Sequence, residues 1–133
     1  MRPRIAIASA AMTCGLVFAA GCSGGSGTSV SIAEGMTFDP SSLTVKVGDT
    51  VTWTNDAKDA HTVTTEQDSL PAGAAYFASG GANTEEAARE GVAVGLIGEG
   101  QTYQMTFLTP GTYRYFCIPH ESQGMRGSIV VEE

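Results

Sequence analysis

Apolar and polar residues alternate with a period of two in several short runs of this chain. The runs are residues 30–33, 43–47, 51–54, 61–65, 103–107, 113–115 and 127–131. Alternation of this kind is typical of strands with one buried face, and Gly, Pro, Asn and Asp separate the runs. The pattern predicts an all-β domain, an antiparallel sandwich or barrel of short strands. In one run we expect either Tyr113 or Tyr115 to pack in the core and the other to face solvent.

One stretch has the composition of a helix. Residues 83–90 contain good helix formers, Thr84 is a suitable N-cap and Gly91 a suitable end. Acidic residues in the first turn would favour the positive end of the helix dipole. We therefore expect one short helix inside a long connection from residue 66 to residue 100.

The N-terminus has the features of an export signal. It has a basic start, a mostly apolar stretch at residues 5–20 and small residues directly before Cys22. This stretch is too short for a lasting membrane span. Because small residues before a cysteine resemble a bacterial lipobox, we predict that residues 1–21 are a lipoprotein-type signal peptide and that Cys22 carries lipid. Ordinary signal cleavage, with Cys22 uninvolved, is the alternative.

Residues 22–28 are rich in Ser and Gly and fit a flexible linker. Residues 29–133 then form one domain of about a hundred residues, which is large enough for a core without disulfides. From residue 22 onward lie all fourteen acidic residues but only five of the seven basic ones, so this part carries a net charge of −9. That balance argues against nucleic acid as a partner and allows a basic protein partner.

The chain has three cysteines, and they have different expected fates. Cys14 would leave with the signal peptide, and Cys22 is the expected lipid site. Cys117 remains alone in an exported domain, where a free thiol needs a reason. Metal ligation supplies one.

A short run from Cys117 to Met125 also holds His120, and His61 lies far upstream after an alternating segment. The two histidines are the only ones in the chain. Two imidazoles, a thiolate and a weak thioether are the ligand set of a blue-copper electron-transfer site. We predict one Cu(2+)/Cu(+) ion per chain, held by His61, Cys117 and His120 with Met125 as the axial ligand. A rigid strand and a short loop would keep these donors nearly still.

The surrounding motifs resemble the plastocyanins and related cupredoxins over nearly everything after the linker. The similar segments are residues 36–40, 51–55, 70–73, 110–117 and 124–131. The resemblance implies a Greek-key β-sandwich and an electron carrier that is not an enzyme. The two residues between Cys117 and His120 match plastocyanin and pseudoazurin rather than azurin. The four residues between His120 and Met125 differ from the shorter loop of amicyanin.

Three features depart from the plastocyanin pattern. Ala60 stands where proline is usual, and Phe116 stands where plant plastocyanins have a tyrosine used in partner docking. The connection at residues 74–99 is also longer than in plant relatives. The ligands are intact, but the departures leave open whether the partner is photosynthetic, respiratory or denitrifying.

Other functions fit this sequence less well. A protease-like cysteine nucleophile would need an orienting residue and an oxyanion site, and nothing in the sequence indicates them. Copper oxidases and nitrite reductases need further histidines for a second copper, and none remain. Met125 as a plain core residue would leave its spacing from His120 unexplained. The main alternative is copper storage or delivery, although such carriers more often expose Met-rich or multi-cysteine sites.

For electron transfer we expect the ligand loop at one end of the sandwich, with His120 nearest to solvent. Met36, Ala60 and Pro119 would surround it as an apolar docking patch for a redox protein donor and acceptor. Other carboxylates would steer a basic partner at longer range, namely Glu66, Asp68, Glu85 and Glu86. The protein is expected to be a monomer, lipid-anchored at the outer face of the cytoplasmic membrane or in the periplasm.

Overall fold

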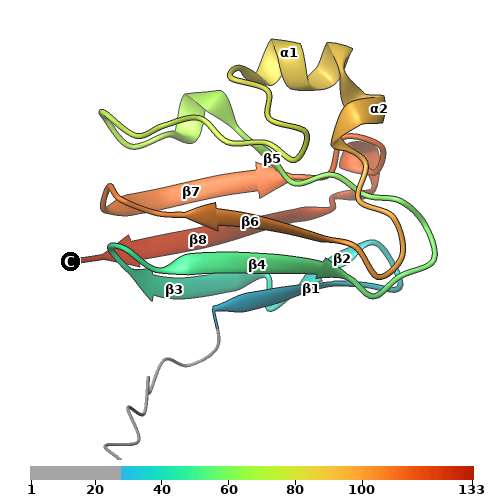
Figure 1. Ribbon diagram of the computed structural model, residues 1–133, viewed down its shortest axis with the longest axis horizontal. Helices are drawn as coiled ribbons and strands as arrows, with labels where there is room; N and C mark the ends of the chain where they lie inside the picture. Colours follow the sequence, from blue (N-terminus) through green and yellow to red (C-terminus); the bar gives the residue numbers. More distant parts are fainter. Residues whose placement is uncertain (1–27) are drawn as a thin grey trace, which may run out of the picture.

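The computed structural model describes residues 28–133, and the predicted signal peptide and Cys22 lie outside the described residues. In the described part, eight strands form two four-stranded sheets that pack face to face (Figure 1). The strands are β1 (Ser29–Ala33), β2 (Thr37–Asp39), β3 (Ser42–Lys46), β4 (Thr50–Asn55), β5 (Thr64–Thr65), β6 (Thr102–Thr106), β7 (Gly111–Phe116) and β8 (Arg126–Glu132). The predicted all-β sandwich is confirmed.

The strand order is β2-β1-β4-β6 in one sheet and β3-β8-β7-β5 in the other. The chain passes repeatedly between the sheets, so strands adjacent in sequence often lie in different layers. Most paired strands are antiparallel, as expected, but β1 pairs parallel with β4 and β3 pairs parallel with β8. The crossings therefore make both sheets mixed.

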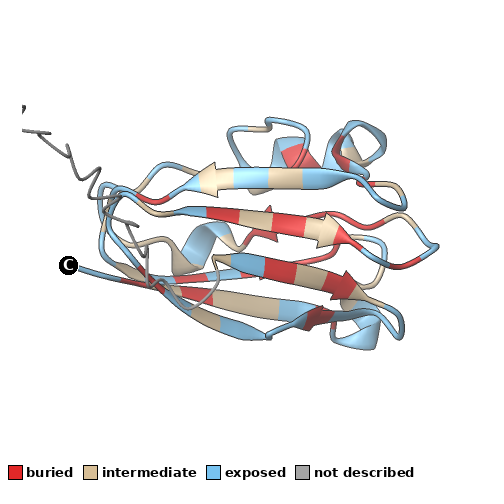
Figure 2. Cartoon of the chain, turned by 60° about the horizontal axis from the view of Figure 1, so that its bottom comes forward, coloured by how far each residue is buried: buried red, intermediate tan, exposed pale blue. Residues whose placement is uncertain are grey.

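The core lies between the sheets, and strands of both sheets contribute buried residues to it (Figure 2). Val51, Trp53 and Asn55 of β4 all point inward and are fully buried. The Trp53 ring packs edge-on against Tyr115, with centroids 5.4 Å apart. Both Tyr113 and Tyr115 are buried, so the expectation that one of them faces solvent is wrong. The two side chains lie on the same face of β7 because residues two apart on a strand share a face.

The predicted strand at residues 61–65 is regular only at its last two residues, which form β5. The main chain of His61 instead makes an isolated antiparallel bridge with Ile97. The Val63 N–H donates to the Ser79 hydroxyl at 3.0 Å. Because these partners come from the long connection and not from a neighbouring strand, regular ladder pairing starts only at β5.

The predicted helix is α1 (Glu85–Glu90), capped by the Thr84 hydroxyl, which accepts from the Ala87 N–H at 3.1 Å. A second short helix, α2 (Val92–Gly95), follows directly. Its four residues are too few to show a helical period. Two single turns of 3-10 helix complete the described elements, η1 (Gln67–Ser69) and η2 (Glu121–Gln123).

The two α-helices lie together above β5 in Figure 1, at the rim of the sandwich. Among residues 28–133, no helix has the length and apolar character needed to cross a membrane.

Candidate metal centre

The structure brings the side chains of His61, Cys117 and His120 together. One potential ligand atom from each lies within 4.8 Å of the others. The Cys117 Sγ is 3.6 Å from His61 Nδ1 and 3.4 Å from His120 Nδ1. Cys117 and His61 are buried, and His120 is partly exposed. His120 is therefore the residue through which this cluster reaches the surface.

The loop after β7 closes on itself and places Met125 beside Cys117 along the main chain. The Cys117 N–H donates to the Met125 carbonyl at 3.1 Å, and the Met125 N–H donates to the His120 carbonyl at 3.3 Å. Gly124 turns the chain with φ at +78°, in the left-handed region that glycine adopts without strain. The Met125 side chain is buried. The loop thus contains three of the four predicted ligands within nine residues, and its backbone hydrogen bonds hold Met125 next to Cys117 and His120.

Asn55 is a supporting residue that the sequence patterns did not single out. Its Nδ2 donates to the carbonyls of Asp59 and Ile97, both at 2.8 Å, and its Oδ1 accepts from the Ala57 N–H at 3.0 Å. The amide therefore ties the loop leading to His61 to the segment that bridges His61. The signal was present in the alternation, which places Asn55 on the buried face of β4 and not in the polar loop that follows.

Thr62 connects the two halves of the site. Its N–H donates to the Cys117 Sγ at 3.4 Å, and its hydroxyl accepts from the Ile118 N–H at 2.9 Å. Thr62, which follows the predicted ligand His61, thus orients the predicted ligand Cys117 from a distant part of the chain. Nothing in the sequence distinguishes this threonine from the others nearby.

Burial controls the electrostatics of the donors. It raises the pKa of the Cys117 thiol, and the N–H donation from Thr62 opposes this shift in part. Burial also lowers the pKa of His61, and the neighbouring His120 lowers it further. Both effects favour the neutral imidazole of His61, the form in which histidine binds a metal. A cation placed between the three donors would favour the thiolate. Sulfur and nitrogen donors without a carboxylate suit copper and not Ca²⁺ or Mg²⁺.

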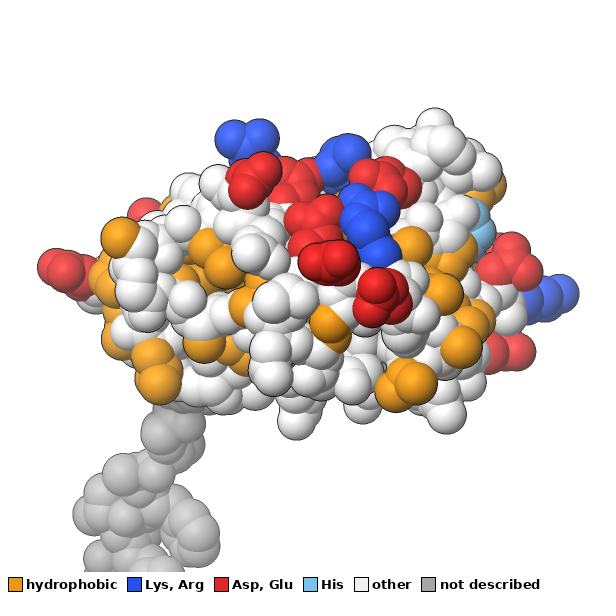
Figure 3. Space-filling view, turned by 90° about the horizontal axis from the view of Figure 1, so that it is seen from above, with side chains coloured by type: hydrophobic (Ala, Val, Ile, Leu, Met, Phe, Trp, Pro, Cys, Tyr) orange, Lys and Arg blue, Asp and Glu red, His pale blue; other side chains and the backbone are white. Residues whose placement is uncertain are grey.

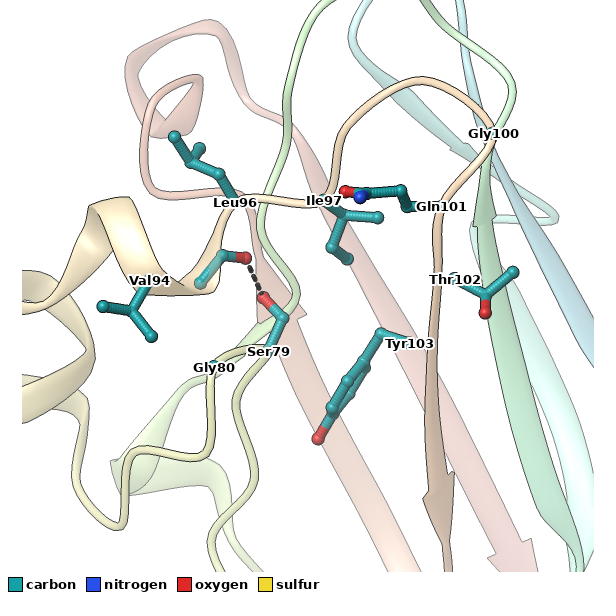
Figure 4. Close-up of a pocket in the computed structure, with 10 residues that line it drawn as sticks. Ser79, Gly80, Val94, Leu96, Ile97, Gly100, Gln101, Thr102 and Tyr103 are labelled. Carbon is teal, nitrogen blue, oxygen red and sulfur yellow. Dashed lines mark hydrogen bonds between the residues drawn. The ribbon is translucent and has the colours of Figure 1, made fainter.

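A separate pocket of about 470 Å³ lies under α2 (Figure 4). Its lining includes Ile97 and the ring of Tyr103, and at its edge the Ser79 hydroxyl donates to the Gly95 carbonyl at 2.6 Å. None of the three clustered donors lines it. The pocket is therefore distinct from the metal centre, although Ile97 in its lining pairs with the backbone of His61.

The predicted docking residues are accessible to a partner. Met36 and Pro119 are exposed, and Ala60 and His120 are partly exposed. Met36 lies in the turn between β1 and β2 with φ at +60°.

The carboxylates expected to steer a basic partner are partly neutralised. Glu66 forms an ion pair with Arg126, and Glu85 forms one with Arg89 at 2.8 Å. The negative potential around Glu66 and Glu85 is therefore weaker than the sequence alone implied.

The sequence matches, over residues 26–132, the family described as copper binding proteins of the plastocyanin/azurin family. The chain belongs to this family. Plastocyanin of Scenedesmus fuscus is 40% identical over 97 residues, covering 73% of this chain and 88% of that protein. Plastocyanin A/B of Petroselinum crispum is 35% identical over 97 residues, covering 73% of this chain and 89% of that protein.

Solved structures of cupredoxins agree with this assignment. A Cu(I) form of an amicyanin mutant superposes with a TM-score of 0.57 at 35% identity, covering 78% of this chain and 80% of that one. A mutant plastocyanin of a fern has the same TM-score at 27% identity, covering 78% of this chain and 99% of that one. The expected cupredoxin fold and family are confirmed. The chain is a plastocyanin-like member of a family of electron-transfer proteins that bind one copper.

Proposed function

We propose that this protein carries single electrons between redox proteins and that His61, Cys117 and His120 hold its copper, with Met125 as a weak axial ligand. The convergence of one sulfur and two imidazoles within 4.8 Å supports this most directly. Copper, when bound, supplies the one-electron couple. A thiolate suits Cu(I) and imidazoles suit Cu(II), so the same donors serve both states.

The chain's own part is to hold the donors still. His61 is fixed by two backbone hydrogen bonds with Ile97, at 3.1 and 2.7 Å, and by the buried Asn55 amide. Cys117 is fixed at the end of β7 and by the Thr62 N–H. Because packing and hydrogen bonds hold these donors in place, the site rearranges little when copper changes its oxidation state.

Copper titration of the apoprotein tests this assignment. Cu(II) should bind with one equivalent per chain and produce an intense visible copper–thiolate absorption. After reduction, the protein should retain its copper against a moderate Cu(I) chelator. Ready release to that chelator would instead indicate storage or delivery.

We also propose that the protein is exported as a monomer and tethered by lipid on Cys22 to the outer face of the cytoplasmic membrane. The support is in the sequence, which has a basic start, an apolar stretch, small residues before Cys22 and a Ser/Gly segment after it. Mass spectrometry of the mature protein should find Cys22 as a lipid-bearing first residue. The Cys22→Ala variant should lack the lipid and remain in the soluble fraction. An unmodified native N-terminus at another residue would refute the anchor, though not export.

Electron transfer is proposed to pass through the His120 edge, with Met36, Ala60 and Pro119 as the uncharged docking patch. The Met36→Asp variant should slow transfer to the native partner about tenfold, which corresponds to about 1.4 kcal/mol. Asp tolerates the left-handed conformation at this position better than Met does, so folding should not suffer.

Stopped-flow kinetics should show that the Met36→Asp defect persists at about 1 M salt, where the screening length is only about 3 Å. The matched control is Leu108→Asp, because Leu108 is exposed and follows β6 at the far end of the sheet from Asn55. The control should transfer electrons at the native rate. Equal rates for both variants would exclude the proposed docking patch.

A further inference from the structure

Phe116, the last residue of β7, is buried although it should face outward. Its neighbour Tyr115 points into the core, so strand alternation directs Phe116 to the opposite side. The ring is nevertheless only 1% exposed. Two guanidinium groups cover it, with the Cζ of Arg89 4.8 Å and that of Arg126 5.7 Å from the ring centroid. Arg89 belongs to α1 and Arg126 to the start of β8.

The Arg89 side chain also binds the loop that carries the predicted ligands. Its Nη1 donates to Glu121 Oε2 at 2.7 Å, and its Nη2 donates to Glu121 Oε1 at 3.0 Å. Two parallel hydrogen bonds of this kind fix orientation as well as distance. Glu121 directly follows His120 and begins η2, so α1 is joined to the segment between His120 and Met125.

The other side of this network is attached to η1. Arg89 donates to Glu85 Oε1 from Nε at 3.1 Å and from Nη2 at 2.8 Å. Glu85 in turn exchanges two hydrogen bonds of 3.0 Å with Gln67, which begins η1 directly after β5. The network therefore runs from η1, which follows β5, to the loop after His120. Figure 3 shows acidic and basic side chains interleaved on this face.

We propose that Arg89 is a positioning residue of the metal centre, which acts through Glu121 to hold the ligand loop against α1. The inference rests on the proposed function, since that loop is taken to carry copper ligands. Arg89 and Glu121 side chains are 40% and 34% exposed. Half-exposed ion pairs add little to global stability. The effect of Arg89 is therefore local, and it restricts the loop and not the whole fold.

Hydrogen exchange of the apoprotein tests the loop restraint without copper. The Arg89→Gln variant should exchange the amides of residues 118 and 120–124 about threefold faster, as expected for loss of the exposed ion pair between Arg89 and Glu121. Arg114→Gln is the matched control, because Arg114 is exposed on β7 and makes no ion pair among residues 28–133. Arg89→Lys keeps the positive charge but cannot form the two parallel hydrogen bonds to Glu121. Its loop amides should exchange at a rate between those of the native protein and Arg89→Gln.

A double variant shows whether Arg89 acts through Glu121. Arg89→Gln combined with Glu121→Gln should exchange at most slightly faster than Arg89→Gln alone, because Glu121 also faces Arg126, at 3.8 Å, a longer contact than its pair with Arg89. If the two substitutions add, or if Arg89→Gln leaves the loop amides at native rates, the proposal is overturned. The hydrogen-exchange measurements need no metal, so a negative result in them is distinguishable from a failure of the protein to bind copper.

The copper-loaded protein gives a second readout that simple loss of stability would not move. The Cu(II) electron paramagnetic resonance lines should broaden in Arg89→Gln, because an unrestrained loop places the donors over a wider range. The charge-neutral double variant should broaden them too. Val45→Ala, which only thins the buried core at β3, should lower the unfolding temperature and leave the lines unchanged. Native line widths in Arg89→Gln would contradict the positioning role.

Discussion

Replacing Cys117 with serine is expected to abolish the visible copper–thiolate absorption and leave the fold in place. The side chain is buried, and in residues 28–133 no second cysteine could replace it. Serine has nearly the same size, and the Thr62 N–H that donates to Sγ can donate to its hydroxyl. A hydroxyl does not ionise near neutral pH, however, so the variant lacks the donor on which the absorption depends. Visible spectroscopy and circular dichroism of the copper-loaded variant measure both effects.

Met125→Leu is the matched control for this substitution. The Met125 side chain is buried, and leucine fills a similar volume at a cost of less than about 1.5 kcal/mol. Because a thioether is only a weak axial donor, the colour should persist, and the reduction potential should rise. A blue Cys117→Ser protein would refute the ligand assignment, and a colourless Met125→Leu protein would show that the axial position matters more than proposed.

The Asn55→Ala variant should lose about 3 kcal/mol of unfolding free energy. The truncation leaves the Ala57 N–H and the Asp59 carbonyl without this partner and the Ile97 carbonyl with the His61 N–H alone, and a buried group left unpaired costs about 1–3 kcal/mol. The loop before His61 and the segment at Ile97 are then no longer joined by a side chain. We therefore also expect copper to dissociate faster. Urea unfolding of the apoprotein gives the first quantity, and transfer of copper to a chelator gives the second.

Thr52→Ala controls for a polar truncation on the same strand. Thr52 is partly exposed and accepts only from the Gln104 side chain at 2.9 Å, so its loss should stay within about 0.5 kcal/mol. If Asn55→Ala were as stable as Thr52→Ala, the Asn55 amide would not support the His61 segment.

The donor cluster was predictable because the chain offers so few alternatives. With two histidines and one cysteine in the domain, the spacing from Cys117 to Met125 and the distant His61 leave one consistent ligand set. Period-two alternation located most strands, and the Thr84 cap located α1. These features depend on local patterns, which a sequence displays directly.

Features that depend on distant contacts were not predictable in the same way. The backbone of His61 pairs with Ile97, which lies in a connection with no strand pattern of its own. Arg89 and Glu121 are 32 residues apart, and nothing in either local sequence marks them as partners. The error on Tyr113 and Tyr115 was of another kind, since the alternation itself places both on one face.

Voltammetry of the copper-loaded native protein tests the central claim most directly. If rigid donors serve both oxidation states, the protein should give one reversible one-electron wave per chain, unchanged over repeated cycles. The wave should be absent in the apoprotein. A wave that disappears as copper leaves on reduction, or no wave from a fully loaded protein, would contradict the proposal that this plastocyanin-like protein is an electron carrier.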